Sequence, residues 1–176
     1  MNAFTNFESP IGRLLLTSDG SALTGLYMEL SGKARCTDGW SEDVCIAPLS
    51  ATVRQLTEYF AGTRRTFDLP LRLQGTPFQQ RVWRELTEIP YGATWSYGQV
   101  AKRIHNPSAS RAVGLANGRN PISILVPCHR VIGADGSLTG YGGGLERKRW
   151  LLAHENTTVP VSRASVAYHR SACQEF

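Results

Sequence analysis

The run Pro127-Cys128-His129-Arg130 places a thiol next to an imidazole and a guanidinium. A lone cysteine is more often a small buried hydrophobic residue than a nucleophile. Here the neighbouring groups can accept a proton or supply positive charge, and both effects favour the reactive thiolate. The pattern therefore indicates that Cys128 is a nucleophile.

A thiol nucleophile needs a base, and the base needs an acceptor that orients it. His129 is the candidate base, and Glu155, at the end of an expected helix over residues 145–154, is the candidate acceptor. The apolar residues 122–126 predict a short buried strand that presents Cys128 rigidly. Adjacent residues of a strand point to opposite faces, so we expect a water molecule to connect Cys128 with His129.

Capping and apolar spacing predict the elements around this site. Capping boxes at Thr76 and Ser96 begin helices that end near residues 89 and 103. Asn106 lies in an expected turn, after which Ser108 is expected to cap a third helix that ends near Asn117. The second and third helices fit a helix-turn-helix.

The first part of the chain is predicted to be rich in β-structure. Apolar runs over residues 12–17 and 23–28 flank a turn, and helical spacing over residues 50–60 ends at Gly62. Residues 31–47 form a loop or an edge strand, and residues 62–75 form a connector with room for one strand. We expect an α+β fold: a small sheet-and-helix domain over residues 1–75, a mostly helical domain over 76–155, and a tail over 156–176.

Charge and composition limit the function. The net charge is +5, and the whole excess lies in residues 76–150, which hold 10 basic and 4 acidic side chains. This asymmetry indicates either a polyanionic partner or only a basic surface. No apolar run is long enough to span a membrane and no secretory signal is present, so a cytoplasmic protein is expected.

The remaining motifs predict neither a metal nor a cofactor. The four cysteines form no CxxC pair, so we expect neither a disulfide framework nor a zinc site. The glycines of residues 140–144 lack the spacing of a nucleotide-binding loop. Cys173 is expected to be an exposed bystander thiol.

Residues 75–155 resemble the methylated-DNA–protein-cysteine methyltransferases, also called O6-alkylguanine-DNA alkyltransferases. The resemblance is carried by ordered motifs: Ser96-Tyr97, Arg111-Ala112-Val113-Gly114, Asn120-Pro121, Pro127-Cys128-His129-Arg130-Val131-Ile132, Tyr141 and Trp150-Leu151-Leu152-Ala153-His154-Glu155. Residues 1–74 match this family only loosely.

The resemblance implies a role for each residue of the candidate site. Cys128 becomes the nucleophile and alkyl acceptor, His129 the base acting through water, and Glu155 the group that orients it. Asn120 corresponds to a hinge asparagine between the DNA-binding helix and the active-site strand. Tyr97 corresponds to the tyrosine that polarises the departing guanine; without the resemblance it would be interpreted as a core aromatic residue.

The family also implies the partner, double-stranded DNA bound through its minor groove with the alkylguanine flipped out. Arg111 corresponds to an arginine that fills the gap, although a phosphate contact or a solvated charge is the commoner role of arginine. The small side chains of its helix favour close approach over sequence readout. The residues expected to contact DNA are Arg111, Tyr97, Ser96, Ala112, Gly114 and Asn106.

The pocket for the alkyl group is expected to contain Tyr141, Pro127, Val131 and Gly142. Some family members carry serine where this chain has Gly142, so we expect a pocket that tolerates groups larger than methyl.

The sequence thus predicts irreversible transfer of an alkyl group from O6-alkylguanine, and from O4-alkylthymine, to Cys128. The protein is expected to act once, as a monomer that could bind DNA cooperatively. A lesion-binding sensor, a helix-turn-helix regulator and a thiol hydrolase are the alternatives. A lesion-binding sensor lacks an acceptor cysteine, which this chain has. A helix-turn-helix regulator leaves Cys128 unexplained, and a thiol hydrolase leaves Arg111 unexplained.

Overall fold

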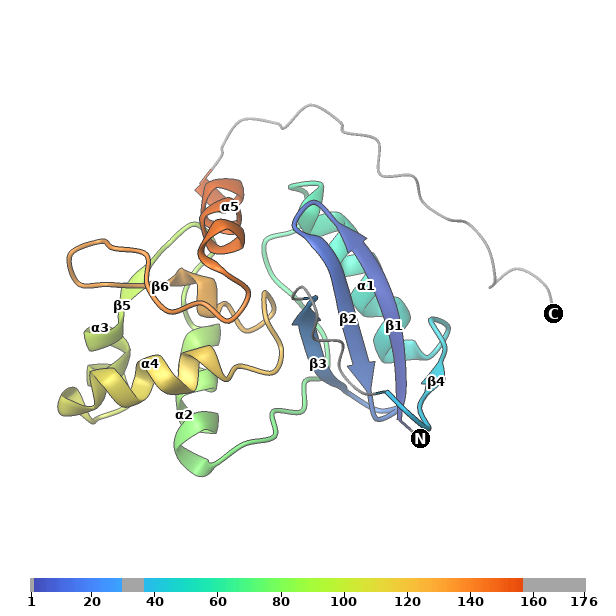
Figure 1. Ribbon diagram of the computed structural model, residues 1–176, viewed down its shortest axis with the longest axis horizontal. Coiled ribbons are helices and arrows are strands. Elements are labelled where there is room, and N and C mark those ends of the chain that lie inside the picture. The colour runs from blue at the N-terminus through green and yellow to red at the C-terminus, as the bar shows by residue number, and fades with distance from the viewer. Residues whose placement is uncertain (1, 30–36, 157–176) are drawn as a thin grey trace.

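The computed structural model describes residues 2–29 and 37–156, which form two units side by side (Figure 1). In the N-terminal unit a four-stranded sheet packs on helix α1, and the C-terminal unit groups helices α2 to α5 around a small two-stranded sheet. This arrangement confirms the expected α+β fold. Apart from Asn156, the expected tail over residues 156–176 lies outside the described residues, as does Cys173.

The N-terminal sheet has the order β3-β2-β1-β4. Strands β1 (Ala3–Ser9), β2 (Gly12–Ser18) and β3 (Leu23–Met28) are antiparallel, whereas β4 (Ser41–Glu42) runs parallel to β1. Strand β1 was not predicted from the sequence. Its buried positions alternate, but polar Thr5 lies between Ala3 and Phe7 and weakens the apolar pattern.

Helix α1 (Ala47–Phe60) covers one face of this sheet. It begins three residues before the expected start because Pro48 is accommodated in the first turn, where no backbone N–H is needed. Gly62 follows the helix with φ +75°, a conformation that favours glycine, and the helix ends where expected. Tyr59, in the last turn, is fully buried. In the connector, residue Leu71 makes an isolated bridge with Leu23, so the expected extra strand is reduced to one residue.

The C-terminal unit begins with two capped helices, as predicted. Thr76 caps α2 (Pro77–Thr87) and Ser96 caps α3 (Tyr97–Arg103), and each makes the reciprocal pair of bonds with a glutamine three residues on. Helix α4 (Ser110–Gly118) packs against both. This packing fits the expected helix-turn-helix.

The start of the third helix was predicted incorrectly. A short 3-10 turn, η1 (Pro107–Ala109), precedes α4, and Ala109 rather than Ser108 occupies the cap position. The Ser108 hydroxyl instead donates to Asn106 Oδ1 at 3.2 Å. Because Pro107 already fixes a helical φ, the chain turns before the helix and the hydroxyl is used within the turn.

The chain then forms a second 3-10 turn, η2 (Cys128–Arg130), followed by β6 (Val131–Ile132), which pairs in parallel with β5 (Trp95–Ser96). Helix α5 (Leu145–Asn156) lies next to η2 and faces the end of α1. Within the described ranges, no helix has the length and apolar character required to cross a membrane.

Candidate active site

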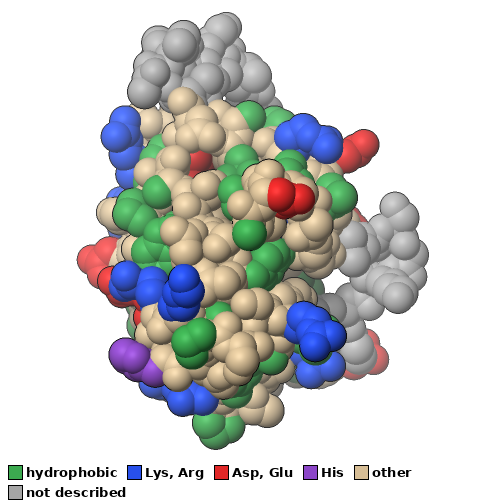
Figure 2. All heavy atoms as spheres, turned by 90° about the vertical axis from the view of Figure 1, so that its left-hand side faces the viewer, with side chains coloured by type: hydrophobic (Ala, Val, Ile, Leu, Met, Phe, Trp, Pro, Cys, Tyr) green, Lys and Arg blue, Asp and Glu red, His purple; other side chains and the backbone are tan. Residues whose placement is uncertain are grey.

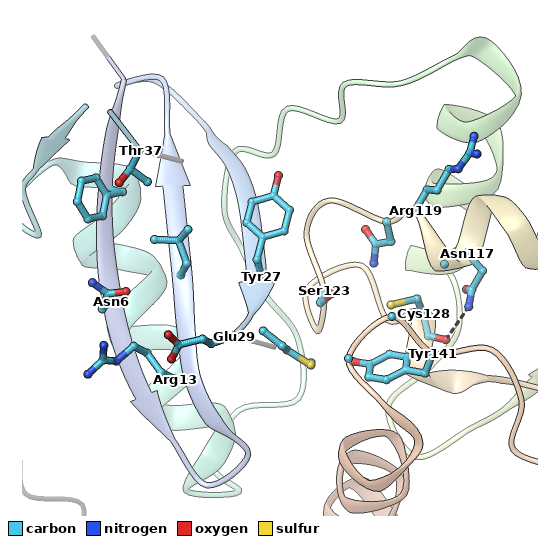
Figure 3. Close-up of a pocket in the computed structure, with 17 residues that line it drawn as sticks. Asn6, Arg13, Tyr27, Glu29, Thr37, Asn117, Arg119, Ser123, Cys128 and Tyr141 are labelled. Atoms are coloured by element: carbon cyan, nitrogen blue, oxygen red, sulfur yellow. Dashed lines mark hydrogen bonds between the residues drawn. The ribbon is translucent and has the colours of Figure 1, made fainter. Parts of the chain in front are cut away.

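Cys128 lies at the wall of a cavity between the two units (Figure 3). The cavity has a volume of about 590 Å³. Side chains of β1, β2 and β3 form one wall, and the opposite wall belongs to the C-terminal unit. On that wall the cavity is lined by Asn117, Gly118, Arg119, Asn120, Ser123, Cys128, Tyr141, Gly142 and Gly143.

The segment before Cys128 is a buried loop, which corrects the strand predicted for residues 122–126. Ile124 has φ +71°, and the segment makes only isolated bridges. The Asn120 side chain takes the place of a neighbouring strand: Oδ1 accepts from Ile122 N at 3.0 Å, and Nδ2 donates to Val126 O at 2.8 Å. The proline at each end of the run offers no N–H to a sheet. Asn120 therefore fixes the loop that leads to the thiol.

A second asparagine connects α4 to the thiol-bearing residue. Asn117, which is 2% exposed, donates from Nδ2 to the carbonyl oxygen of Cys128 at 3.2 Å (Figure 3). Asn117 therefore connects the last turn of α4 directly to the backbone of Cys128.

His129 and Glu155 form the pair that the sequence predicted. His129 Nε2 lies 2.7 Å from Glu155 Oε1, and both side chains are buried. An ionised carboxylate can only accept, so Nε2 carries the proton and Nδ1 is the basic nitrogen. Nδ1 is buried and has no hydrogen-bond partner within the described residues. Burial lowers the pKa of His129, although Glu155 opposes this effect.

Arg130 turns away from the thiol, contrary to the expectation that it favours the thiolate. Its Nε donates to Glu155 Oε2 at 2.7 Å and its Nη2 to Glu155 Oε1 at 2.9 Å, while Nη1 donates to Ile89 O at 2.6 Å. Burial works against ionisation of Glu155, but hydrogen bonds from His129 and Arg130 prevail and lower its pKa. Glu155 is therefore a fully charged acceptor at neutral pH.

The thiol is protonated in the resting protein. Burial raises the pKa of Cys128, and this outweighs the opposing effects of Asn120, Ser123 and the Lys148 ammonium. Lys148 was missed in the sequence analysis. It is 0% exposed and donates from Nζ to Val131 O at 2.6 Å. Its position three and seven residues before Leu151 and Glu155 places it on the buried face of α5, and this spacing is the signal that could have identified it.

Tyr97 lies between α4 and the loop after β6. Its hydroxyl donates to Thr139 O at 2.9 Å, and its ring faces Gly114, where a Cβ atom would lie 3.7 Å away. Burial raises the pKa of Tyr97, so its hydroxyl keeps its proton. Because residue 114 is a glycine, the Tyr97 ring can pack closely against α4.

Two family models match this chain: the ribonuclease-like domain of 6-O-methylguanine DNA methyltransferase over residues 3–73, and the DNA binding domain of the same enzyme over residues 77–157. The chain belongs to the 6-O-methylguanine DNA methyltransferase family. A methylated-DNA–protein-cysteine methyltransferase of Mycobacterium tuberculosis is 53% identical over 89% of this chain and 94% of its own. One from Haemophilus influenzae is 47% identical over 86% of this chain and 85% of its own.

Solved structures of this family have the same fold. The O6-methylguanine methyltransferase of Mycobacterium tuberculosis has a TM-score of 0.83 at 52% identity, and covers 92% of this chain and 97% of its own. The OGT of the same organism in complex with DNA has a TM-score of 0.80 at 55% identity, covering 88% of this chain and 92% of its own.

In this family member, α4 presents a mixed face to solvent. Arg111, Leu115 and Arg119 lie at successive turns, with Ala112 and Gly118 between them, and all are exposed. Leu115 is 69% exposed, which is unusual for a large apolar side chain. Figure 2 shows the side of the molecule with α3 and α4, where Lys and Arg side chains lie around largely uncharged atoms.

The other residues expected to contact DNA lie near this face. Asn106 is exposed in the turn before α4, and Ser96 is half-buried at the start of α3, where its hydroxyl accepts from Gln99 N. Gly114 is half-buried against Tyr97.

Two of the four residues expected in the alkyl pocket line this cavity. Tyr141 and Gly142 line the cavity with Cys128, whereas Pro127 and Val131 are buried and are not among its lining residues. Ser123 also lines the wall and was not predicted from the sequence. The loop turns back on itself at Ile124 and so brings Ser123 to the surface of the cavity.

The cysteines differ from expectation at one position. Cys128 is a free thiol, whereas Cys45 is disulfide-bonded, although no disulfide framework was expected. Within residues 2–29 and 37–156, no three His, Cys, Asp or Glu side chains are grouped so that they could hold a metal ion.

Proposed function

We propose that this protein repairs DNA by direct reversal, transferring the alkyl group of O6-alkylguanine to Cys128 Sγ. The observation that carries this proposal is the buried relay beside the cavity: Cys128 at the wall, His129 with Nδ1 unpaired, and Glu155 holding Nε2. These three residues supply, in this order, a nucleophile, a base and the acceptor that orients the base. The family's names for its members support the same reaction.

The proposed reaction is a displacement at the alkyl carbon. The thiol proton passes to His129 Nδ1 through water, Sγ forms a bond to the carbon, and the bond from that carbon to guanine O6 breaks with its electron pair remaining on the base. The guanine anion then gains a proton from the Tyr97 hydroxyl, which exchanges its hydrogen bond to Thr139 O for one to the base and is itself reprotonated from water. Because a thioether does not hydrolyse readily, each molecule acts once.

The electrostatics of the site suit a nucleophile that forms only with substrate. Burial raises the pKa of Cys128 and lowers that of His129, so the neutral thiol and neutral imidazole are favoured together. When the alkyl carbon lies in line with Cys128 Sγ in the closed site, it can accept the electron pair of sulfur. Transfer of the thiol proton to His129 then leads directly to formation of the S–C bond. The resting thiol is in this way kept from side reactions.

We also propose that α4 lies in the minor groove and that the target base is flipped into the site. Arg111 and Arg119 at the ends of the exposed face suit phosphate or gap-filling contacts, and Ala112 and Gly118 permit close approach. The sequence-independent face suits a repair protein whose lesions occur in any context. The protein works as a monomer in the cytoplasm, where the DNA of a nucleoid is accessible, and O4-alkylthymine is a second substrate.

The test is to incubate the full chain with a short duplex that carries O6-methylguanine and to weigh the intact protein. Transfer adds one methylene mass, about 14 daltons, at Cys128 and saturates at one per protein. A Cys128→Ser variant should bind the same duplex without gaining mass. Tight binding by the wild type without a mass gain would instead identify a lesion sensor, and neither binding nor gain would reject the function.

A further inference from the structure

One side chain of the N-terminal unit reaches the relay. Tyr59, in the last turn of α1, is 0% exposed, and its hydroxyl donates to Glu155 Oε1 at 2.8 Å. Its backbone carbonyl accepts from His154 Nε2 at 2.8 Å. Tyr59 thus holds two consecutive residues of α5, and one of them is the acceptor for His129.

The hydroxyl of Tyr59 is not explained by packing. Its ring packs against Phe60, Phe67 and Tyr91, contacts that a phenylalanine ring would make equally well. Burying a phenolic hydroxyl is unfavourable unless it finds a partner. The partner here is the same carboxylate oxygen that accepts from His129.

The Glu155 carboxylate is saturated with donors. Oε1 accepts from Tyr59, His129 Nε2 and Arg130 Nη2, and Oε2 accepts from Arg130 Nε and, at 3.3 Å, from Gly92 N. Arg130 approaches one edge of the carboxylate and Tyr59 comes from α1, so together they fix its plane. A carboxylate fixed in this way can hold the imidazole in one orientation and one tautomer.

We propose that Tyr59 is a positioning residue for alkyl transfer, supplied by the N-terminal unit: its hydroxyl holds Glu155 Oε1 where that oxygen accepts the hydrogen bond of His129 Nε2. This inference rests on the roles proposed above for Cys128, His129 and Glu155. The N-terminal unit is consequently part of the reaction site and not only a cover for the transfer domain.

A second consequence concerns charge. The Tyr59 hydroxyl withdraws negative charge from Glu155, which would otherwise stabilise a protonated His129 more strongly. The charged and titratable groups that act on Glu155 or on His129 are Tyr59 from α1, Tyr91 from the loop after α2, His129 and Arg130 from η2, Tyr141 from the loop before α5, and Lys148 from α5. Removing the hydroxyl therefore favours the imidazolium, which cannot act as the base.

The experiment measures single-turnover transfer from an O6-methylguanine duplex by the full chain, from pH 5.5 to pH 9, with the final mass gain giving the active fraction. Tyr59→Phe should slow transfer about tenfold, the effect of losing one hydrogen bond to a charged group. Its rate should also begin to fall at a higher pH on the acid side than that of the wild type. Tyr91→Phe is the matched control, because within the described residues its hydroxyl donates to His154 O, at 3.4 Å, and makes no hydrogen bond to Glu155, so transfer should stay close to the wild-type rate.

A His129→Gln background separates positioning from general stabilisation. If Tyr59 acts through His129, adding Tyr59→Phe to His129→Gln should cause no further loss. A wild-type rate for Tyr59→Phe, an unshifted acid limb, or an equal loss in both backgrounds would overturn the inference. If His129→Gln alone transfers at the wild-type rate, the proposed base is wrong and the inference fails with it; a slow His129→Gln beside a fast Tyr59→Phe rejects the inference alone.

Discussion

Lys148 and Tyr97 share one acceptor: the Lys148 ammonium and the Tyr97 hydroxyl each donate to the carbonyl oxygen of Thr139 at 2.9 Å. The Lys148 side chain is buried, and burial lowers its pKa to about 8. Its charge also lowers the pKa of Cys128 in part. Lys148 therefore favours the thiolate at neutral pH and loses that influence above pH 8 as it deprotonates.

Replacing Lys148 should accordingly have a pH-dependent effect on transfer. At pH 7, Lys148→Met should slow methyl transfer about tenfold, because the variant loses the nearby positive charge that lowers the pKa of Cys128. At pH 9 the difference from the wild type should shrink, because Lys148 of the wild type is then mostly neutral. Single-turnover rates at both pH values test this, with Arg149→Met, an exposed position on the same helix, as control. A constant ratio would mean that Lys148 acts only through packing.

Arg130 should contribute strongly to stability because it is the bidentate partner of a buried carboxylate. Arg130→Met should lower the free energy of unfolding by about 3 kcal/mol, since it leaves Glu155 buried without its main counter-charge. Urea denaturation followed by circular dichroism measures this change. The exposed pair of Arg13 and Glu8 provides the comparison, and Arg13→Met should leave stability close to that of the wild type. Equal effects of the two variants would contradict the analysis.

The same ion pair predicts how stability depends on acid. The folded protein lowers the pKa of Glu155, so this carboxylate stabilises the fold above its unfolded pKa of about 4.3. That contribution is lost as the pH falls from this value toward the lower pKa of the folded state, because the unfolded chain then binds a proton that the folded protein does not. Between pH 5 and pH 3 the wild type should lose stability more steeply than Glu155→Gln, whose side chain does not titrate. Parallel curves from urea denaturation at each pH would show that other carboxylates dominate.

Sequence alone predicted the parts of this fold that depend on local patterns. The capping boxes at Thr76 and Ser96 and the glycine after α1 are local, and the structure contains them as expected. The strand over residues 122–126 failed because its apolar composition indicates burial and does not distinguish a strand from a buried loop. The conformation is decided by the Asn120 side chain, which accepts a hydrogen bond from Ile122 N and donates one to Val126 O.

The candidate site shows the same division between local and distant information. Cys128, His129 and Glu155 could be predicted because two are adjacent and the third follows a recognisable helix. The spacing of Lys148 along its helix indicates that it is buried, but Tyr59 could not be predicted, since its hydroxyl meets a carboxylate 96 residues away. Only the packing of α1 against α5 reveals that contact.

The exposed face of α4 should bind DNA through both charge and apolar contact. Arg111→Ala should weaken binding to a lesion duplex and reduce the slope of log affinity against log salt by about one, as expected for one lost phosphate contact. Leu115→Ser should weaken binding about tenfold without changing that slope, because the leucine buries apolar surface. Fluorescence anisotropy at several salt concentrations separates the two effects. Leu145→Ser is the control, because Leu145 is also exposed. If Leu115→Ser binds the duplex as tightly as Leu145→Ser does, Leu115 does not contact the DNA groove.

Gly142 should determine how large an alkyl group the site accepts. It lines the cavity, and a Cβ atom at this position would lie 3.3 Å from Gly118 O, so a side chain there requires only a small shift of the loop. Gly142→Ser should therefore retain transfer of methyl, whereas transfer of benzyl should slow about tenfold because the pocket has lost volume. The methyl adduct serves as the internal control, and Gly142→Ala should fall between glycine and serine. Equal benzyl rates for the serine variant and the wild type would mean that the size limit is set by the wall formed by Ser123 and Tyr141.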